Sequence, residues 1–413
     1  MFQKQQIMRK VLYSLIPIFL YSIYLYGWRV IAVTAVVFGV GILSEFIMEK
    51  ARNKKVSEAV LVTSALLAMS FPPAVPLWVA AVASVFSVVM GKGVYGGFGR
   101  NVFNPAITGR IFTYISFPLL MQTTWMIPGV FGTLGINGQT QGSALIEAVF
   151  MILIVAAAYL IITRNYEKKG LVKITIFGSI AVTIALYVIT SYAGVLQPEV
   201  DAVSTVTPLE IYRGLDSENL PESAEYINDN TLGNLFFGRR VGSIGESAIF
   251  LIIIAAIYLM WTKTANWRMI LMTLLSAAVL TTIFYYAGFI ADLSGGALMN
   301  PAGKTLLEQI VDITKFLFSG SLFYVAVFMS TDPVSGPNKP LAQFLYGIII
   351  GSVTIVIRVF SGFPEGTSFG ILMGNTFANL LDEISPKPKK KAKKSTAKKQ
   401  TASNKPASEG AKA

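Results

Sequence analysis

The sequence contains no histidine and no cysteine, so two side chains that often bind metals or act as nucleophiles are absent. The usual protein ligands of zinc, iron–sulfur clusters and haem are therefore absent. Any redox chemistry must then use an organic cofactor. The remaining candidates are hydroxyl groups near position 207, amides near position 101 and two carboxylates in or beside apolar segments.

The hydroxyl candidates belong to residues 201–209, Asp-Ala-Val-Ser-Thr-Val-Thr-Pro-Leu, which open a long polar stretch between two apolar segments. Thr207, followed by Pro208 and Glu210, has the pattern of a helix N-cap, and this is one interpretation. In the other, the Thr207 hydroxyl forms an ester with a cofactor phosphate, which needs a Thr or Ser that a modifying enzyme can reach. The residues alone favour the N-cap and are compatible with the ester without requiring it.

The amide candidates stand in a glycine-rich stretch, residues 91–105. This stretch lacks the Gly-Lys-Ser/Thr ending of a phosphate-binding Walker loop. Glycines allow the backbone to approach a flat ligand closely, and the amides of Asn101 and Asn104 offer both donor and acceptor to the edge of an isoalloxazine or quinone ring. The alternative is a tight cytoplasmic loop whose basic residues only mark that side of a membrane.

Two carboxylates lie in or at the end of apolar segments, where ionisable groups are costly and are candidates for function. Glu45 lies about one turn inside its segment, and Asp382 ends the last segment. Each could bind a cation or relay a proton, or could pair with a lysine or reach the nearby interface. Arg358 could hold a phosphate, although pairing with Glu365 is the favoured interpretation.

Apolar segments must position all of these groups. The chain is 54% hydrophobic and 14% charged, whereas a soluble domain carries roughly 25% charged residues. A membrane crossing needs about 20 apolar residues per helix. The sequence therefore predicts an all-α, polytopic transmembrane bundle with twelve candidate segments, at residues 11–27, 29–48, 57–71, 75–90, 107–121, 143–163, 171–195, 246–262, 269–292, 313–331, 343–361 and 368–382. The segments beginning at 57, 107 and 368 are short enough to be tilted or broken.

The basic residues predict the orientation, because short loops rich in Lys and Arg stay in the cytoplasm. If the chain crosses the membrane twelve times, most of its Lys and Arg residues outside the tail fall on the same side of the membrane as the tail. This side is then the cytoplasm, with both termini in it, and Thr207 lies outside. The residues on the cytoplasmic side are Arg9, Lys10, the basic residues of 49–55, Lys92, Arg100, Arg110, Arg164, Lys168, Lys169, Lys263, Arg268, Lys339 and the tail.

The segments divide into an N-terminal half (1–195), a periplasm-facing loop (196–245), a C-terminal half (246–382) and a Lys-rich tail (383–413) that we expect to be disordered. Much of the net charge of +12 lies in this tail, which would attract anionic membrane lipid, so we do not expect a nucleic-acid partner.

Two polar-proline turns, Asn104-Pro105 and Asp332-Pro333, stand at corresponding helix ends of the two halves. They would suit an internal duplication with broken helices around a midplane site. They would also suit two unrelated turns, because Asn-Pro and Asp-Pro commonly start turns.

Several blocks in the same order resemble a known family, which comprises the B-type subunits (NqrB) of the sodium-translocating NADH:quinone oxidoreductases (Nqr) and, more distantly, the D-type subunits (RnfD) of the Rnf complexes. The resemblance covers most of residues 8–382, and the block Gly-Ser-Ile-Gly-Glu favours the Nqr side. The blocks are residues 8–11, 71–78, 96–101, 104–106, 242–246, 265–268, 331–335 and 358–366.

The resemblance implies two flavins. The family binds FMN through a phosphoester to the last Thr of a Ser/Thr-Gly-Ala-Thr motif preceded by Asp, and Asp201, Ser204 and Thr207 fit this motif. Thr205-Val206 replaces its Gly-Ala pair. The family also holds a riboflavin near the cytoplasmic end, and the block with Asn101 and Asn104 matches that site.

The resemblance also implies two acidic positions for Na⁺, which correspond to Glu45 and Asp382 in this sequence. The implied function is a subunit of a bacterial inner-membrane translocase, which passes electrons from NADH through covalent FMN and riboflavin to quinone and couples them to sodium export with other subunits. Relative to the family core of ten helices, the segments within about 143–195 are an inserted pair. The D-type subunit of an Rnf complex and a flavin-free channel or secondary carrier are the alternatives.

Overall fold

The computed structural model describes residues 2–126, 128, 232–290, 301, 303–361, 363 and 366–386. Within these ranges, four helices are long and apolar enough to cross a membrane, or five if one bent pair counts as a single span. Three further apolar helices are shorter. This architecture confirms a polytopic, helical membrane protein. The expected segments 143–163 and 171–195 lie outside the described residues.

The chain begins with two long helices joined at a single glycine. Helix α1 (Gln6–Tyr26) and helix α2 (Trp28–Ala51) meet at Gly27, whose φ of 73° is a conformation that glycine adopts at little cost. Strand β1 (Phe2–Gln3) pairs in parallel with strand β2 (Val56–Ser57). The start of α1 is thereby fixed beside the end of α2.

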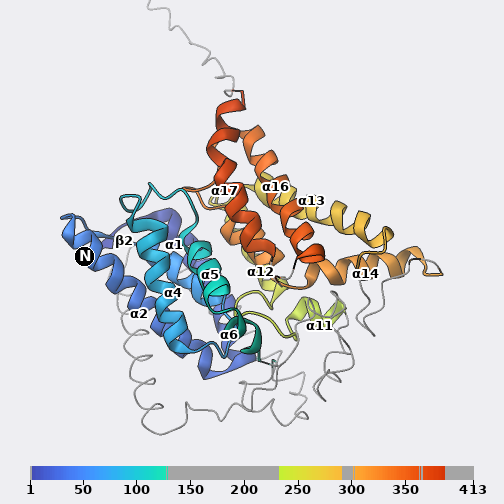
Figure 1. Cartoon of the computed structure of the whole chain (residues 1–413), viewed down its shortest axis with the longest axis horizontal. Coiled ribbons are helices and arrows are strands. Elements are labelled where there is room, and N and C mark those ends of the chain that lie inside the picture. The colour runs from blue at the N-terminus through green and yellow to red at the C-terminus, as the bar shows by residue number, and fades with distance from the viewer. Residues whose placement is uncertain are drawn as a thin grey trace, which may run out of the picture.

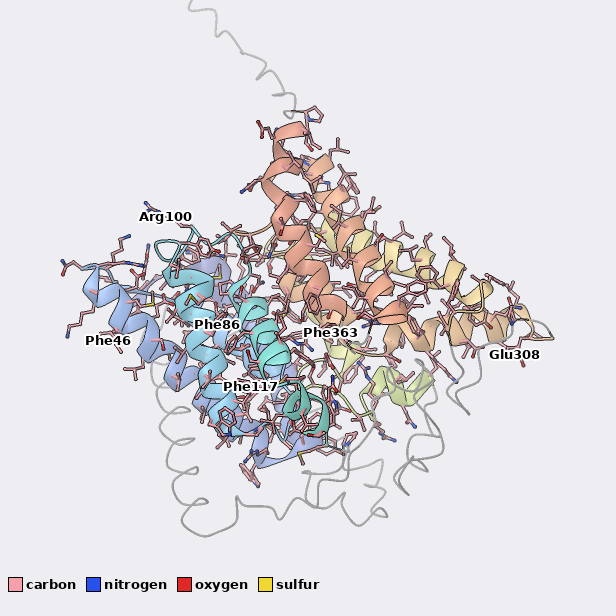
Figure 2. All side chains as sticks on the ribbon, in the orientation of Figure 1. Phe46, Phe86, Arg100, Phe117, Glu308 and Phe363 are labelled. Atoms are coloured by element: carbon pink, nitrogen blue, oxygen red, sulfur yellow. The ribbon has the colours of Figure 1, made fainter. Side chains whose placement is uncertain are left out.

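The next helices are short, as expected for the segments that begin at 57 and 107. They are α3 (Ala59–Met69), α4 (Leu77–Val88), which continues as the π-helix η1 (Val89–Gly93), α5 (Pro105–Ser116) and α6 (Pro118–Thr123). Helix α4 packs between α2 and α5 (Figure 1). Phe86, labelled in Figure 2, stacks on Phe112 with ring centroids 4.0 Å apart and joins α4 to α5.

The C-terminal elements pack beside this group. They are α11 (Leu232–Phe237), α12 (Ile249–Trp261), α13 (Trp267–Tyr286), α14 (Leu306–Phe318), α15 (Leu322–Tyr324), the π-helix η3 (Val325–Met329), α16 (Pro340–Phe360) and α17 (Gly366–Ile384). Helix α16 packs against both α13 and α17, whereas α14 runs outward across their ends (Figure 1).

The position of the broken segment differs from the expectation. The segment expected at 313–331 bends by 66° between α14 and the α15–η3 pair. Gly320 lies at the bend with φ 67°, a left-handed conformation that would cost other residues roughly 1–2 kcal/mol. The segment expected to be short at 368 instead forms α17, a helix of 19 residues.

The two groups of helices share one hydrophobic core, which includes buried residues of α1, α3, α4, α5, α12, η3, α16 and α17. A fully buried loop before α12 crosses between the groups, because the backbone N–H groups of Gly245 and Ile244 donate to the carbonyls of Met69 (2.7 Å) and Phe71 (3.0 Å). Helix α17 also packs on α5. This junction is where the cavity described next is found.

Candidate functional site: a cavity between the two groups of helices

A cavity lies where the N-terminal helices meet the C-terminal ones. Its walls come from the start of α1, from α3, from the end of α12 and from the turns before α5 and after η3. Its empty space is about 660 Å³, a volume that includes open solvent at its mouth. Its lining includes Met8, Val62, Leu66, Lys92, Phe98, Asn101, Asn104, Phe328, Thr331 and Asp332.

The structure brings together the two asparagines that the sequence singled out. Asn104 is buried and caps α5: its Oδ1 accepts from the backbone N–H groups of Ala106 (3.0 Å) and Ile107 (3.4 Å), and its Nδ2 donates to the Met329 carbonyl (3.3 Å). Asn101 is buried too, and its Nδ2 donates to the Phe103 carbonyl (3.1 Å). Asn104 therefore holds the two groups of helices together, while the Asn101 Oδ1 accepts no bond from the described residues.

The glycine-rich stretch before these asparagines is a compact loop with several residues in the left-handed region. Gly97 has φ 98°, and a Cβ there would lie 2.6 Å from Glu49 Oε1. Arg100 marks this loop in Figure 2. The glycine at 97 is therefore explained by the loop's own conformation and its packing on α2.

Glu45 is a member of a buried ion pair. Its Oε2 accepts from Lys92 Nζ at 2.7 Å, and both side chains are 3% exposed. Its Oε1 accepts from the backbone N–H (3.0 Å) and the hydroxyl of Ser57. Lys92 Nζ also donates to Ser57 Oγ at 3.1 Å. One wall of the cavity thus carries an ammonium group that is shared by a carboxylate and a hydroxyl.

Asp332 lies on another wall and forms a turn similar to that of Asn104. Its Oδ1 accepts from the backbone N–H of Val334 (3.1 Å), and its Oδ2 accepts from Ser335 Oγ (2.8 Å). Burial raises the pKa of Asp332, and the bonds from Ser335 and Val334 together with the nearby charge of Lys92 offset part of this rise. Both turns follow a π-helix and line the same cavity. The internal duplication stays a prediction.

Asp382 does not share these contacts. Its carboxylate accepts from the backbone N–H groups of Asn338 (2.8 Å) and Lys339 (2.8 Å), which precede the first turn of α16. It therefore caps α16 from the neighbouring helix α17. The structure places Glu45 and Asp382 in separate hydrogen-bonding networks.

Lys92 and Arg110, two of the basic residues counted on the cytoplasmic side, are buried in the structure, and the side of the membrane on which they lie stays a prediction. Lys92 is buried in η1, and Arg110 is buried on α5. Arg110 Nη2 lies 3.8 Å from Glu246 Oε2, and its guanidinium lies 5.5 Å from the ring centre of Tyr114.

Glu45 and Lys92 are 47 positions apart in sequence, so no local pattern could have paired them.

Asp201, Ser204 and Thr207, the predicted flavin-attachment motif, lie outside the described residues. Arg358 is fully buried, whereas Glu365, its expected partner, is outside the described residues. Within the described ranges, no group of three or more acidic side chains is arranged to hold a metal ion.

The groups that line the cavity fit the edge of a flat, polar ring. The Asn101 Oδ1 is an acceptor, the amide nitrogens of both asparagines each carry a second N–H, and Lys92 is a buried donor. Phe98, with its ring centre 5.8 Å from Lys92 Nζ, adds an aromatic surface at the mouth. A flavin ring could be held here by Asn101, Asn104 and Lys92 if the side chains at the mouth move apart.

A family model described as the NQR2, RnfD, RnfE family matches residues 2–390. The chain is 30% identical over 376 residues to the B-type subunit of the Na⁺-translocating NADH-quinone reductase of Chlamydia felis, with 84% of this chain and 72% of that protein covered. It is 27% identical over 389 residues to the D-type subunit of the ion-translocating oxidoreductase complex of Shewanella amazonensis, with 92% of each chain covered. The corresponding D-type subunit of Actinobacillus succinogenes is 28% identical over 384 residues, with 92% of this chain and 91% of that protein covered.

Proposed function

This chain belongs to the NQR2, RnfD, RnfE family, and we propose that it is the flavin-carrying membrane subunit of an ion-translocating oxidoreductase. The observation that carries this proposal is the cavity, because it joins Asn101 and Asn104, which the family resemblance assigns to a riboflavin, with Lys92 and Phe98. A bound flavin supplies reversible electron acceptance. The protein's side chains supply position and electrostatics.

We propose Thr207 as the attachment point of a second flavin, FMN, through a phosphoester. The support is the family motif, with Asp201, Ser204 and Thr207 in place and Thr205-Val206 at its centre, and the outside location that the charge pattern predicts. Electrons would pass from this flavin towards the cavity and then to a quinone or another acceptor. NADH would be the original donor in an Nqr complex.

A denaturing gel tests the covalent flavin. The wild-type chain should carry yellow-green fluorescence after unfolding, and Thr207→Ala should lose it, with Thr205→Ala as the matched control that keeps it. Fluorescence that persists in Thr207→Ala would move the attachment elsewhere. A purified complex that is colourless would favour a flavin-free channel or secondary carrier instead.

Two complexes could contain this protein. The sodium-translocating NADH:quinone oxidoreductase is favoured by the Gly-Ser-Ile-Gly-Glu block, whereas the similarity to the D-type subunit of Shewanella amazonensis, 27% identical over 389 residues, keeps an Rnf complex as the alternative. Mass spectrometry of the purified complex distinguishes them. An NADH-oxidising flavoprotein subunit would indicate the first, and a ferredoxin-like subunit would indicate the second.

The transported ion is proposed to be Na⁺, exported from the cytoplasm across a bacterial inner membrane, with both termini of this chain cytoplasmic. Glu45 and Asp382 are the proposed acidic groups on its path. Glu45 would have to exchange Lys92 for the ion, because its carboxylate is paired with that ammonium at 2.7 Å. The test is the Na⁺ concentration that gives half-maximal turnover, which should rise in Glu45→Gln and stay unchanged in a variant of exposed Glu383.

A further inference from the structure

Lys92 is a buried cation, and one of its N–H groups has no acceptor among the residues that the structure describes. Its side chain is 3% exposed, and a protonated amine carries three N–H groups. Two of them are used, by Glu45 Oε2 at 2.7 Å and Ser57 Oγ at 3.1 Å. No third acceptor lies among the residues that the structure describes.

The spare donor belongs to a side chain that lines the cavity. Lys92 shares the lining with Asn101, Asn104 and Asp332, and its Nζ lies 5.8 Å from the ring centre of Phe98. Among the described lining residues it is the only basic one. A buried polar group normally finds a partner, so a ligand in this cavity is the natural acceptor for the third N–H.

We propose that Lys92 donates its third N–H to the flavin ring bound in this cavity and stabilises the ring's reduced form. This inference rests on the proposed function. A flavin bound here that took up two electrons from the proposed FMN on Thr207, together with one proton, would carry one negative charge, located at N1 and the C2 carbonyl. A cation placed near N1 raises the reduction potential of a flavin. Lys92 would thus set the potential at which electrons enter the cavity.

The charges around Lys92 allow it to respond to the ring. Glu45 neutralises it in the absence of a ligand, and Asp332 lies on another wall of the same cavity. Glu49 is also near, but it forms an ion pair with Arg52 at 3.4 Å. A reduced ring would therefore compete with Glu45 for the ammonium, whereas a neutral oxidised ring would compete less.

The experiment measures two properties of the purified complex: the noncovalent flavin released by acid extraction, and the midpoint potential of that flavin in a spectroscopic titration. The variants are Lys92→Met, Lys92→Arg and the double variant Glu45→Gln with Lys92→Met, which leaves no unpaired buried carboxylate. Lys50→Met is the matched control. Lys50 is exposed and lies 5.6 Å from the ring centre of Phe46 on α2, outside the cavity lining (Figure 2 labels Phe46).

In Lys92→Met and in the double variant, we expect the equilibrium constant for reduction of the ring to be at least tenfold lower than in the wild type. This is a shift of about 30 mV to more negative potential for two electrons. Lys92→Arg and Lys50→Met should keep the wild-type potential. Loss of the flavin from Lys92→Met together with its retention in Lys92→Arg would also support a contact with the ring.

Two results separate this inference from the proposed function. If the double variant keeps its flavin at the wild-type potential, or if Lys92→Arg shifts as far as Lys92→Met, the charge of Lys92 does not act on the ring and the inference is wrong. If the wild-type complex releases no noncovalent flavin, the flavin site in the cavity is itself wrong.

Discussion

At the scale of single residues, Asn104 has a structural task that is separate from any ligand. Its Oδ1 caps α5, and its Nδ2 donates to Met329 in the other group of helices. Asn104→Ala should lower the free energy of unfolding by about 0.5–2 kcal/mol, the usual cost of a lost cap. Asn104→Ser, which keeps a capping oxygen, should lose less. Thermal unfolding in detergent measures both, and equal stability of Ala and wild type would contradict this role.

Asp382 makes a second prediction at this scale. Because its carboxylate accepts from the backbone N–H groups that precede α16, Asp382→Ala should destabilise the protein by about 1 kcal/mol. The neighbouring Glu383 is exposed, so Glu383→Ala is the control and should have no effect. An Asp382→Ala protein of wild-type stability with a changed Na⁺ dependence would assign the residue to the ion path alone.

The sequence predicted part of the site at the residue scale. Asn101 and Asn104 are three positions apart, so a shared location could be predicted from the motif. The ion pair of Glu45 with Lys92 could not, since packing of α2 against α4 and η1 decides which lysine the carboxylate meets. For Asp332 the sequence predicted only a turn. Its position in the cavity lining depends on how the two groups of helices meet, which the sequence does not report.

At the scale of elements, the contact between α13 and α16 depends on glycines. A Cβ at Gly351 would lie 2.1 Å from Ser276 Oγ and 2.3 Å from the Thr273 carbonyl. Small residues permit such close approach of membrane helices. Gly351→Ala should therefore destabilise the protein by roughly 1–3 kcal/mol through overpacking.

The control for Gly351 is Gly39 on α2, where a Cβ would meet nothing within 4 Å. Gly39→Ala should be neutral or stabilise α2 slightly, because Ala has the higher helix propensity. Thermal unfolding of the two variants side by side gives the comparison. If Gly351→Ala is as stable as Gly39→Ala, the helix contact is looser than the structure indicates.

Hydropathy predicted most of the helices, because a segment that must cross a membrane is apolar whatever it packs against. Ten of the twelve expected segments fall in the described part of the chain, and each contains at least one helix. The bend at Gly320 was not predicted, since hydropathy does not report backbone conformation. Helix α17 extends two residues beyond each end of the expected segment 368–382, because Gly366, Thr367 and Glu383 at these ends are not apolar and hydropathy does not mark them.

At the scale of the whole molecule, the two groups of helices share one large hydrophobic core, and the cavity lies at their junction. Asn104 reaches Met329, the loop before α12 bonds to the end of α3, and both polar-proline turns line the same space. A ligand in this cavity would touch both groups at once. The charge of the ligand could therefore influence how the two groups of helices pack. A protein that couples electron flow to ion movement requires such a link.

The amount of noncovalent flavin in the purified complex tests this account most directly. Val62, which is buried and lines the cavity, is replaced by Trp to fill it, and exposed Val82 on α4 is replaced by Trp as the control. We predict about one noncovalent flavin per chain in the wild type and in Val82→Trp, and none in an assembled Val62→Trp complex. A wild-type complex without this flavin, or a Val62→Trp complex that retains it, would contradict the account.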